Sequence, residues 1–114
     1  MKLKQIMDIL NAEILAYGCD EEAEFDHVFA SDLMSDVLAY ANNEALLITG
    51  LNNPQVIRTA EMMDMHAVLF VRGKQPKEET IELAKEKFVT LLVTEHIMFE
   101  ACGLLFNNGM KGSI

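Results

Sequence analysis

Three short apolar stretches decide the fold: ALLIT at residues 45–49, AVLFV at residues 67–71 and TLLVT at residues 90–94. None of them alternates between apolar and polar residues, as a strand with one wet face would. Strands of this kind are buried on both faces, which is typical of a parallel sheet between two layers of helices. The three stretches therefore predict a βαβαβ core from about residue 45 to residue 93, with parallel strands and right-handed crossovers.

Helical patterns follow each of the three predicted strands. Asn53 followed by Pro54 is a common start of a helix, because asparagine caps the first turn and proline fits the first helical position. The second helix is expected to open at Pro76, and the third to cover residues 96–106. The residues expected to face inward are, helix by helix, Val56, Ile57, Ala60 and Met63; Ile81, Ala84 and Phe88; and Ile97, Ala101 and Leu104 or Leu105.

The first 44 residues are less regular. They predict a helix over residues 3–10, a strand over residues 12–17, an acidic solvated loop at residues 20–24 and a second strand over residues 25–30. Ser31 or Asp32 is then expected to cap a helix that runs through Val37, Leu38 and Tyr40. The predicted fold class is α/β, a three-layer βαβ sandwich with a mainly parallel sheet.

Length and charge exclude several classes of protein. A chain of 114 residues fits one domain, so residues 1–114 are expected to form a single α/β domain with its core at residues 45–106. The net charge of −9 would repel a phosphate backbone, which argues against nucleic acid as a partner. The longest apolar runs fall far short of the roughly 20 residues that a membrane helix needs. We expect a cytoplasmic protein whose two cysteines, Cys19 and Cys102, are free thiols.

The candidate binding site lies at the carboxyl ends of the predicted strands. In open α/β sheets, ligands bind there, where loops converge and helix N-termini present free N–H groups. The loops in question cover residues 30–32, 49–53, 71–74 and 94–96. The ligand-binding residues predicted from them are Ser31, Asp32, Thr49, Gly50, Asn53, Arg72 and Gly73. An anion would suit a site of this composition.

Each of these residues also has a structural interpretation. Gly50 and Gly73 allow either a close approach of a ligand or merely a tight turn after a strand. Arg72 could bind a carboxylate or phosphate with two hydrogen bonds, or it could form a surface ion pair. Ser31 and Asp32 could serve only as helix caps. The sequence leaves both interpretations open.

Motifs of catalysis and of cofactor binding are missing from the sequence. There is no phosphate loop, no dinucleotide fingerprint and no nucleophile elbow. His27, His66 and His96 lack the spacing of metal ligands. We therefore expect no catalytic residues, no metal and no cofactor.

The succession of these motifs resembles the DRTGG domain family. The resemblance covers residues 46–106 and rests on Ile48-Thr49-Gly50, Pro54 with Val56-Ile57, residues 67–73, Pro76, residues 81–84 and residues 91–94. Leu51 departs from the family, which often has a second glycine there. The resemblance implies a fold similar to the N-terminal domain of HPr kinase/phosphorylase. It also implies a regulatory role beside catalytic domains, a place at subunit interfaces and, for stand-alone forms, genes near those of iron hydrogenases.

The leading hypothesis is a non-catalytic regulatory or binding module that recognises a small anionic ligand or a partner protein, linked through the resemblance to anaerobic redox metabolism. The alternative is a purely structural dimerisation or assembly domain, and a homodimer is expected because the hydrophobic fraction is high for so small a chain and because the sheet edge and a methionine-rich surface need cover. A small enzyme is the third hypothesis. It would use Asp32, Asp36 or Glu95 for acid–base chemistry.

Overall fold

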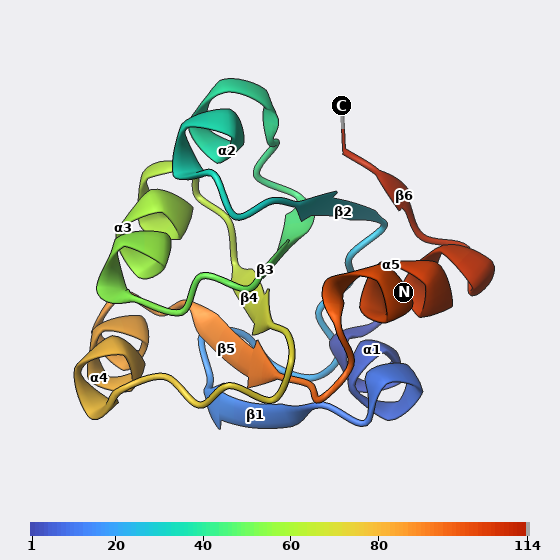
Figure 1. The fold of residues 1–114 in the computed structure, drawn as a ribbon, viewed down its shortest axis with the longest axis horizontal. Helices are drawn as coiled ribbons and strands as arrows, with labels where there is room; N and C mark the ends of the chain where they lie inside the picture. The colour runs from blue at the N-terminus through green and yellow to red at the C-terminus, as the bar shows by residue number, and fades with distance from the viewer. Residues whose placement is uncertain (114) are drawn as a thin grey trace.

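Six strands form one sheet in the order β1-β5-β4-β3-β2-β6 in the computed structural model, which describes residues 1–113 (Figure 1). Only β1 is antiparallel to its neighbour; the other pairs are parallel. The strands are β1 (Glu13–Ala16), β2 (His27–Ala30), β3 (Ala45–Thr49), β4 (Ala67–Phe70), β5 (Thr90–Val93) and β6 (Lys111–Gly112). The helices are α1 (Leu3–Leu10), α2 (Met34–Tyr40), α3 (Pro54–Met62), α4 (Glu78–Glu86) and α5 (Met98–Asn107).

The three apolar stretches form the centre of the sheet. β3, β4 and β5 lie side by side and parallel, with Ile48 opposite Leu69 and Leu69 opposite Leu92. Every residue of these three strands is buried. The prediction of a parallel, doubly covered core is confirmed.

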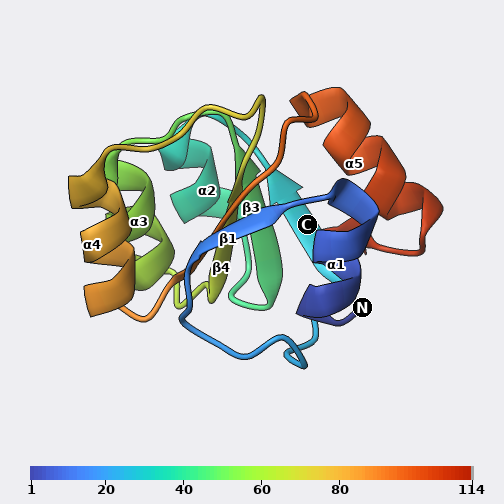
Figure 2. The same ribbon diagram turned by 90° about the horizontal axis from the view of Figure 1, so that it is seen from below.

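Helices cover both faces of the sheet. Figure 1 shows α2, α3 and α4 on one face and α1 and α5 on the other, and Figure 2 shows the same two layers from below. Leu47 and Val68 point into the first core, whereas Leu46, Ile48 and Leu69 point into the second. This alternation explains why the strands had to be apolar throughout, and it confirms the three-layer α/β fold.

The N-terminal region completes the second helical layer. α1 covers the residues predicted for it, and its Leu3, Ile6 and Leu10 side chains are fully buried against the sheet. α1 packs beside α5, so this layer is built from both ends of the described chain (Figure 2). The strand predicted over residues 12–17 is β1, and its antiparallel pairing with β5 adds an edge that the sequence pattern did not specify.

The acidic loop does more than face solvent. Glu22 forms ion pairs with Lys2 and Lys4, each with an N–O distance of 2.7 Å, and so connects the loop to the start of α1. A hydrogen bond from Lys2, and to a smaller extent one from Lys4, lowers the pKa of the Glu22 carboxyl from 4.5 to about 2.

Two helix boundaries differ from the prediction. α4 begins at Glu78, two residues after Pro76, with Lys77 as its N-cap. It ends at Glu86, so Phe88 lies outside the helix with a positive φ of 56° and is 73% exposed. Ile97 is likewise the N-cap residue of α5 and is 52% exposed, because that helix begins only at Met98. The prediction that Phe88 and Ile97 face inward is therefore wrong.

Across residues 1–113, no helix has the combined length and apolarity required to cross a bilayer.

Candidate functional site

The loops that follow β2, β3 and β4 meet at one edge of the sheet. Because these strands are parallel neighbours, their carboxyl ends lie together, as the prediction requires. Asp32 follows β2, Thr49 ends β3 with Gly50 after it, and Arg72 comes two residues after the end of β4. The structure brings these four predicted site residues into one cluster, which we call the strand-end cluster.

Asp32 is the centre of the strand-end cluster. Its Oδ1 atom accepts a hydrogen bond from the Gly50 backbone N–H at 2.6 Å and another from the Thr49 hydroxyl at 3.1 Å. The carboxylate thus ties the end of β2 to the turn after β3. Thr49 is fully buried, whereas Asp32 is exposed at the rim of the protein.

The prediction that Ser31 or Asp32 caps α2 is wrong. The N-cap residue is Leu33, and no side chain caps the helix. Asp32 points away to the β3 turn, where two donors hold its carboxylate. The Ser31 hydroxyl accepts a hydrogen bond from the Leu33 N–H at 3.0 Å, which forms a turn before the helix. Since α2 begins only at Met34, Ser31 and Asp32 lie too early in the chain to cap it.

Arg72 and Gly73 are held in an unusual backbone conformation. Both are left-handed, with φ angles of 67° and 65°, which is uncommon for a residue with a side chain. The Arg72 N–H donates to the His96 carbonyl at 2.8 Å, and the Gly73 N–H donates to the Thr94 carbonyl at 2.7 Å. These bonds to the loop after β5 fix the direction in which Arg72 leaves the sheet.

Gly50 leaves room for two opposite charges. A methyl group added to Gly50 would lie 3.1 Å from a guanidinium nitrogen of Arg72 and 3.4 and 3.5 Å from the two carboxylate oxygens of Asp32. The two charged groups therefore flank the same backbone position. Among the ion pairs formed within residues 1–113, none involves Arg72.

Asn53 and Gly73 lie at the margins of the cluster. The Asn53 side chain accepts a hydrogen bond from the Gln55 N–H at 3.0 Å, so the predicted N-cap of α3 is confirmed. Gly73 faces Glu95, because a methyl group added there would lie 3.2 Å from the Glu95 Cγ atom. A direct role of either residue in binding a ligand stays a prediction.

A polar cavity of about 570 Å³ opens beside Gly73, at the end of β5. It is lined by Leu10, Asn11, Glu13, Gly73, Gln75, Val93, Thr94, Glu95 and His96. The loop after β5 was expected to border the site, but Asn11 and Glu13 were missed. Their only sequence signal was the predicted strand at residues 12–17, whose pairing with β5 the pattern left open.

Comparison with known proteins identifies the family. The sequence profile of the DRTGG domain matches residues 5–106. The chain belongs to the DRTGG domain family. The match begins well before residue 46, where the resemblance was expected to start, so α1, β1 and β2 are part of this DRTGG domain.

A solved structure supports the same fold. It is described as the CBS and DRTGG domains of the regulatory region of Clostridium perfringens pyrophosphatase, complexed with the activator diadenosine tetraphosphate. The TM-score is 0.78 at 22% sequence identity, over 91% of this chain and 45% of that chain. This DRTGG domain therefore matches less than half of its neighbour's length. No curated protein matches the sequence.

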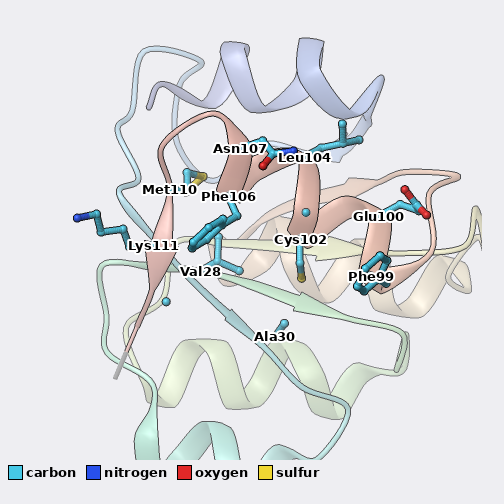
Figure 3. A pocket seen from close by; sticks show the side chains of 12 residues that line it. Val28, Ala30, Phe99, Glu100, Cys102, Leu104, Phe106, Asn107, Met110 and Lys111 are labelled. Atoms are coloured by element: carbon cyan, nitrogen blue, oxygen red, sulfur yellow. The ribbon is translucent and has the colours of Figure 1, made fainter.

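The DRTGG domain carries a second, apolar cavity beside α5. This groove of about 590 Å³ lies between α5 and the strands β2 and β6. Phe99 and Phe106 flank Cys102 on α5, while Val28 and Ala30 face them from β2 (Figure 3). The two phenylalanines are 79% and 69% exposed, and burial raises the pKa of the Cys102 thiol. The helical pattern of residues 96–106 indicates which side chains face the core but not that the outward side borders a groove.

Within the described part of the chain, no three histidine, cysteine or acidic side chains come together as metal ligands would. Both cysteines are free thiols.

Proposed function

We propose that this DRTGG domain is a non-catalytic regulatory module that binds a small anionic ligand at the strand-end cluster. The observation that carries the proposal is the close approach of both Arg72 and Asp32 to Gly50. Arg72 supplies a positive charge that no acidic side chain within residues 1–113 pairs with, although the protein carries 18 acidic against 9 basic residues. The Asp32 carboxylate lies nearby but forms no ion pair with Arg72, so the guanidinium keeps its hydrogen-bond donors for an anion from solution.

The chemistry of the cluster favours a ligand that carries both phosphate and hydroxyl groups. A guanidinium binds phosphate through two parallel hydrogen bonds. Asp32 uses its Oδ1 atom for both bonds to β3, which leaves Oδ2 to accept a hydrogen bond from a sugar hydroxyl. Gly50 has no side chain to keep such a ligand away from the backbone. A nucleotide combines these groups, and the diadenosine tetraphosphate bound in the structural neighbour supports testing nucleotides first.

The same geometry supports a role without catalysis. An enzyme of this fold would need an acid or base that is free to exchange a proton at the strand ends. Asp32 is the one carboxylate among the four residues of the strand-end cluster, its Oδ1 atom holds the β3 turn, and the cluster contains no histidine or second acid beside it. Ligand binding at these loops would instead change how the loops after β2, β3 and β4 are held together, which a neighbouring domain or partner protein could sense.

The test is a binding measurement with two arginine variants. AMP, ATP and diadenosine tetraphosphate are titrated into the protein, and binding is measured by calorimetry. Thermal unfolding is recorded as well, because a ligand at about 100 times its dissociation constant should stabilise the fold by about 2.7 kcal/mol. Arg72→Ala should weaken binding by about 1.5–3 kcal/mol, the usual worth of a hydrogen bond to a charged group. Arg58→Ala is the matched control, because Arg58 is an exposed arginine on α3, away from the strand ends.

A further variant protects the test against misfolding. Arg72→Gly keeps the left-handed backbone without steric strain, so loss of binding in this variant cannot be attributed to a distorted loop. The proposal is wrong if none of the nucleotides shifts the unfolding temperature, or if Arg72→Ala binds as well as Arg58→Ala.

We also propose a cytoplasmic location and a link to anaerobic redox metabolism. The free thiols of Cys19 and Cys102 fit a reducing compartment. The resemblance to stand-alone chains encoded near iron hydrogenase genes supports the metabolic link. Hydrogenase activity measured in a deletion strain and in its parent strain would test this link. Equal activities in the two strains would contradict it.

The second candidate function is assembly of subunits without a small ligand. A separate observation favours it, namely the groove beside α5. This groove is lined mainly by apolar side chains, unlike the charged strand-end cluster.

A further inference from the structure

We propose that the groove between α5 and β2 is the interface of a homodimer, in which the α5 helices of two copies pack antiparallel across a two-fold axis near Cys102 and Gly103. The inference stands apart from the proposed ligand site, because the groove is lined by none of the residues of the strand-end cluster. It rests on the pattern of exposed side chains along α5, on the shape of the groove and on the charges at its two ends.

The outward face of α5 is nearly symmetric about its midpoint. Phe99 and Phe106 are seven residues apart, so they lie on the same side of the helix, about two turns or roughly 10 Å from each other. The midpoint between them falls between Cys102 and Gly103. A two-fold axis through that point, perpendicular to the helix, would place Phe99 of one copy beside Phe106 of the other. Such a self-complementary patch is what a two-fold dimer requires.

Gly103 provides the space for this contact. A methyl group added at Gly103 would meet no atom of its own chain within 4 Å, so nothing within the described protein requires a glycine at this position. Glycine in the interior of a helix nevertheless destabilises it by about 1 kcal/mol relative to alanine. A notch between two large aromatic side chains allows a second helix to approach closely, which would explain the glycine.

The groove floor can receive the partner's aromatic rings. Val28 and Ala30 face α5 from β2, and Figure 3 shows Phe99 and Phe106 hanging over them on either side of Cys102. β6, which forms this edge of the sheet, has only two residues and leaves the groove open toward solvent. Two phenylalanines that are 79% and 69% exposed would be buried together with their symmetry mates. Aromatic side chains of this kind dominate the energetics of protein interfaces.

The charges at the two ends of the groove are complementary. Glu100 lies at one end and Lys111 at the other, with the apolar surface between them (Figure 3). The two-fold operation exchanges the ends, so Glu100 of each copy is brought to the end where the partner contributes Lys111. An exposed pair of this type adds little affinity but selects the antiparallel orientation. A second copy of this chain therefore fits the groove in both its apolar and its charged parts.

The first test measures the oligomeric state of the full chain by sedimentation equilibrium at micromolar concentration. The wild-type protein should sediment at twice its 12.8 kDa mass. Phe106→Lys should raise the dissociation constant of the dimer at least roughly thirtyfold, as expected for a central aromatic residue. Phe88→Lys is the matched control, because Phe88 is also an exposed phenylalanine but lies after α4.

Gly103→Leu separates association from folding. The first carbon of the added side chain would meet no atom of its own chain within 4 Å, so the helix content should stay the same while the dimer dissociates. The proposal is overturned if the wild-type protein is a monomer, which would leave the groove to another occupant, or if Phe106→Lys and Gly103→Leu sediment as the wild type does.

The second test uses the native cysteine near the proposed axis. Mild oxidation at alkaline pH, chosen because burial raises the pKa of the Cys102 thiol, should yield a disulfide-linked dimer on a non-reducing gel. Cys102→Ser should abolish the linked species, whereas Cys19→Ser should leave it. A wild-type dimer that does not cross-link, or that cross-links through Cys19, would show that α5 is not at the axis.

Discussion

Replacing Asp32 with alanine tests whether its carboxylate holds the strand-end cluster together. The change leaves the Gly50 N–H and the Thr49 hydroxyl without their acceptor, which lies 2.6 Å from the first and 3.1 Å from the second. A hydrogen bond to a charged group contributes about 1.5–3 kcal/mol. Asp32 is exposed, so water can replace its oxygen at Gly50. We therefore expect Asp32→Ala to lower the free energy of unfolding by about 2 kcal/mol in total, which is no more than one such bond contributes. For a domain of this size, that loss lowers the unfolding temperature by roughly 8 °C.

The assay is urea unfolding of the wild type, Asp32→Ala and Asp32→Asn, followed by circular dichroism at one protein concentration. Asparagine keeps an acceptor oxygen but removes the charge, so Asp32→Asn should lose only about half as much stability as Asp32→Ala. Equal losses in the two variants would show that the charge of Asp32 stabilises the fold and that its acceptor oxygen alone does not. A loss below about 0.5 kcal/mol for alanine, the size of an ordinary surface substitution, would refute the bridging role.

Three further predictions concern other parts of the fold. Because the folded pKa of Glu22 is lowered to about 2 from 4.5, its ion pairs should stabilise the protein above pH 4.5 and lose this effect as the pH falls toward 2. Glu22→Gln should remove that part of the pH dependence in urea titrations. If the variant loses as much stability between pH 4.5 and 2 as the wild type does, the ion pairs do not stabilise the fold. Gly18→Ala should destabilise the fold by about 3 kcal/mol or more, because the added carbon would lie 2.1 Å from the Phe88 carbonyl oxygen; near-wild-type thermal unfolding would argue against this packing. Thr94→Val should lose about 1–2 kcal/mol in the same measurement, since the buried Thr94 hydroxyl donates to the Leu10 carbonyl at 2.8 Å, and a neutral result would mean that this bond is dispensable.

The elements that the sequence predicted well are those whose signal is local. β3, β4 and β5 were found because strands buried on both faces are apolar at every position. α3 was found because Asn53 and Pro54 mark its first turn through contacts within a few residues. The same locality explains the match of α1 to its predicted bounds.

The features that were missed depend on partners far away in the sequence. Asp32 is a good N-cap residue by type, but its carboxylate binds the Gly50 N–H, 18 residues later, once β2 and β3 pair in parallel. Phe88 fitted a helical spacing that continued past the true end of α4. The exposed Phe99 and Phe106 were overlooked because an apolar residue on a helix was expected to face its own core. The strand ends were placed correctly, and four of the predicted site residues do meet there.

The construction of one helical layer from α1 and α5 has a consequence for synthesis on the ribosome. Once β5 has left the exit tunnel, β1 to β5 can pair, but the α5-facing side of that sheet, with Leu46, Ile48 and Leu69, can be covered only by α1. Complete cover has to wait until residues 98–107 have left the exit tunnel. During that interval the nascent chain exposes an apolar sheet face, the kind of surface that chaperones bind and that favours aggregation. Chains cut short by premature termination before α5 should therefore be held by chaperones or degraded.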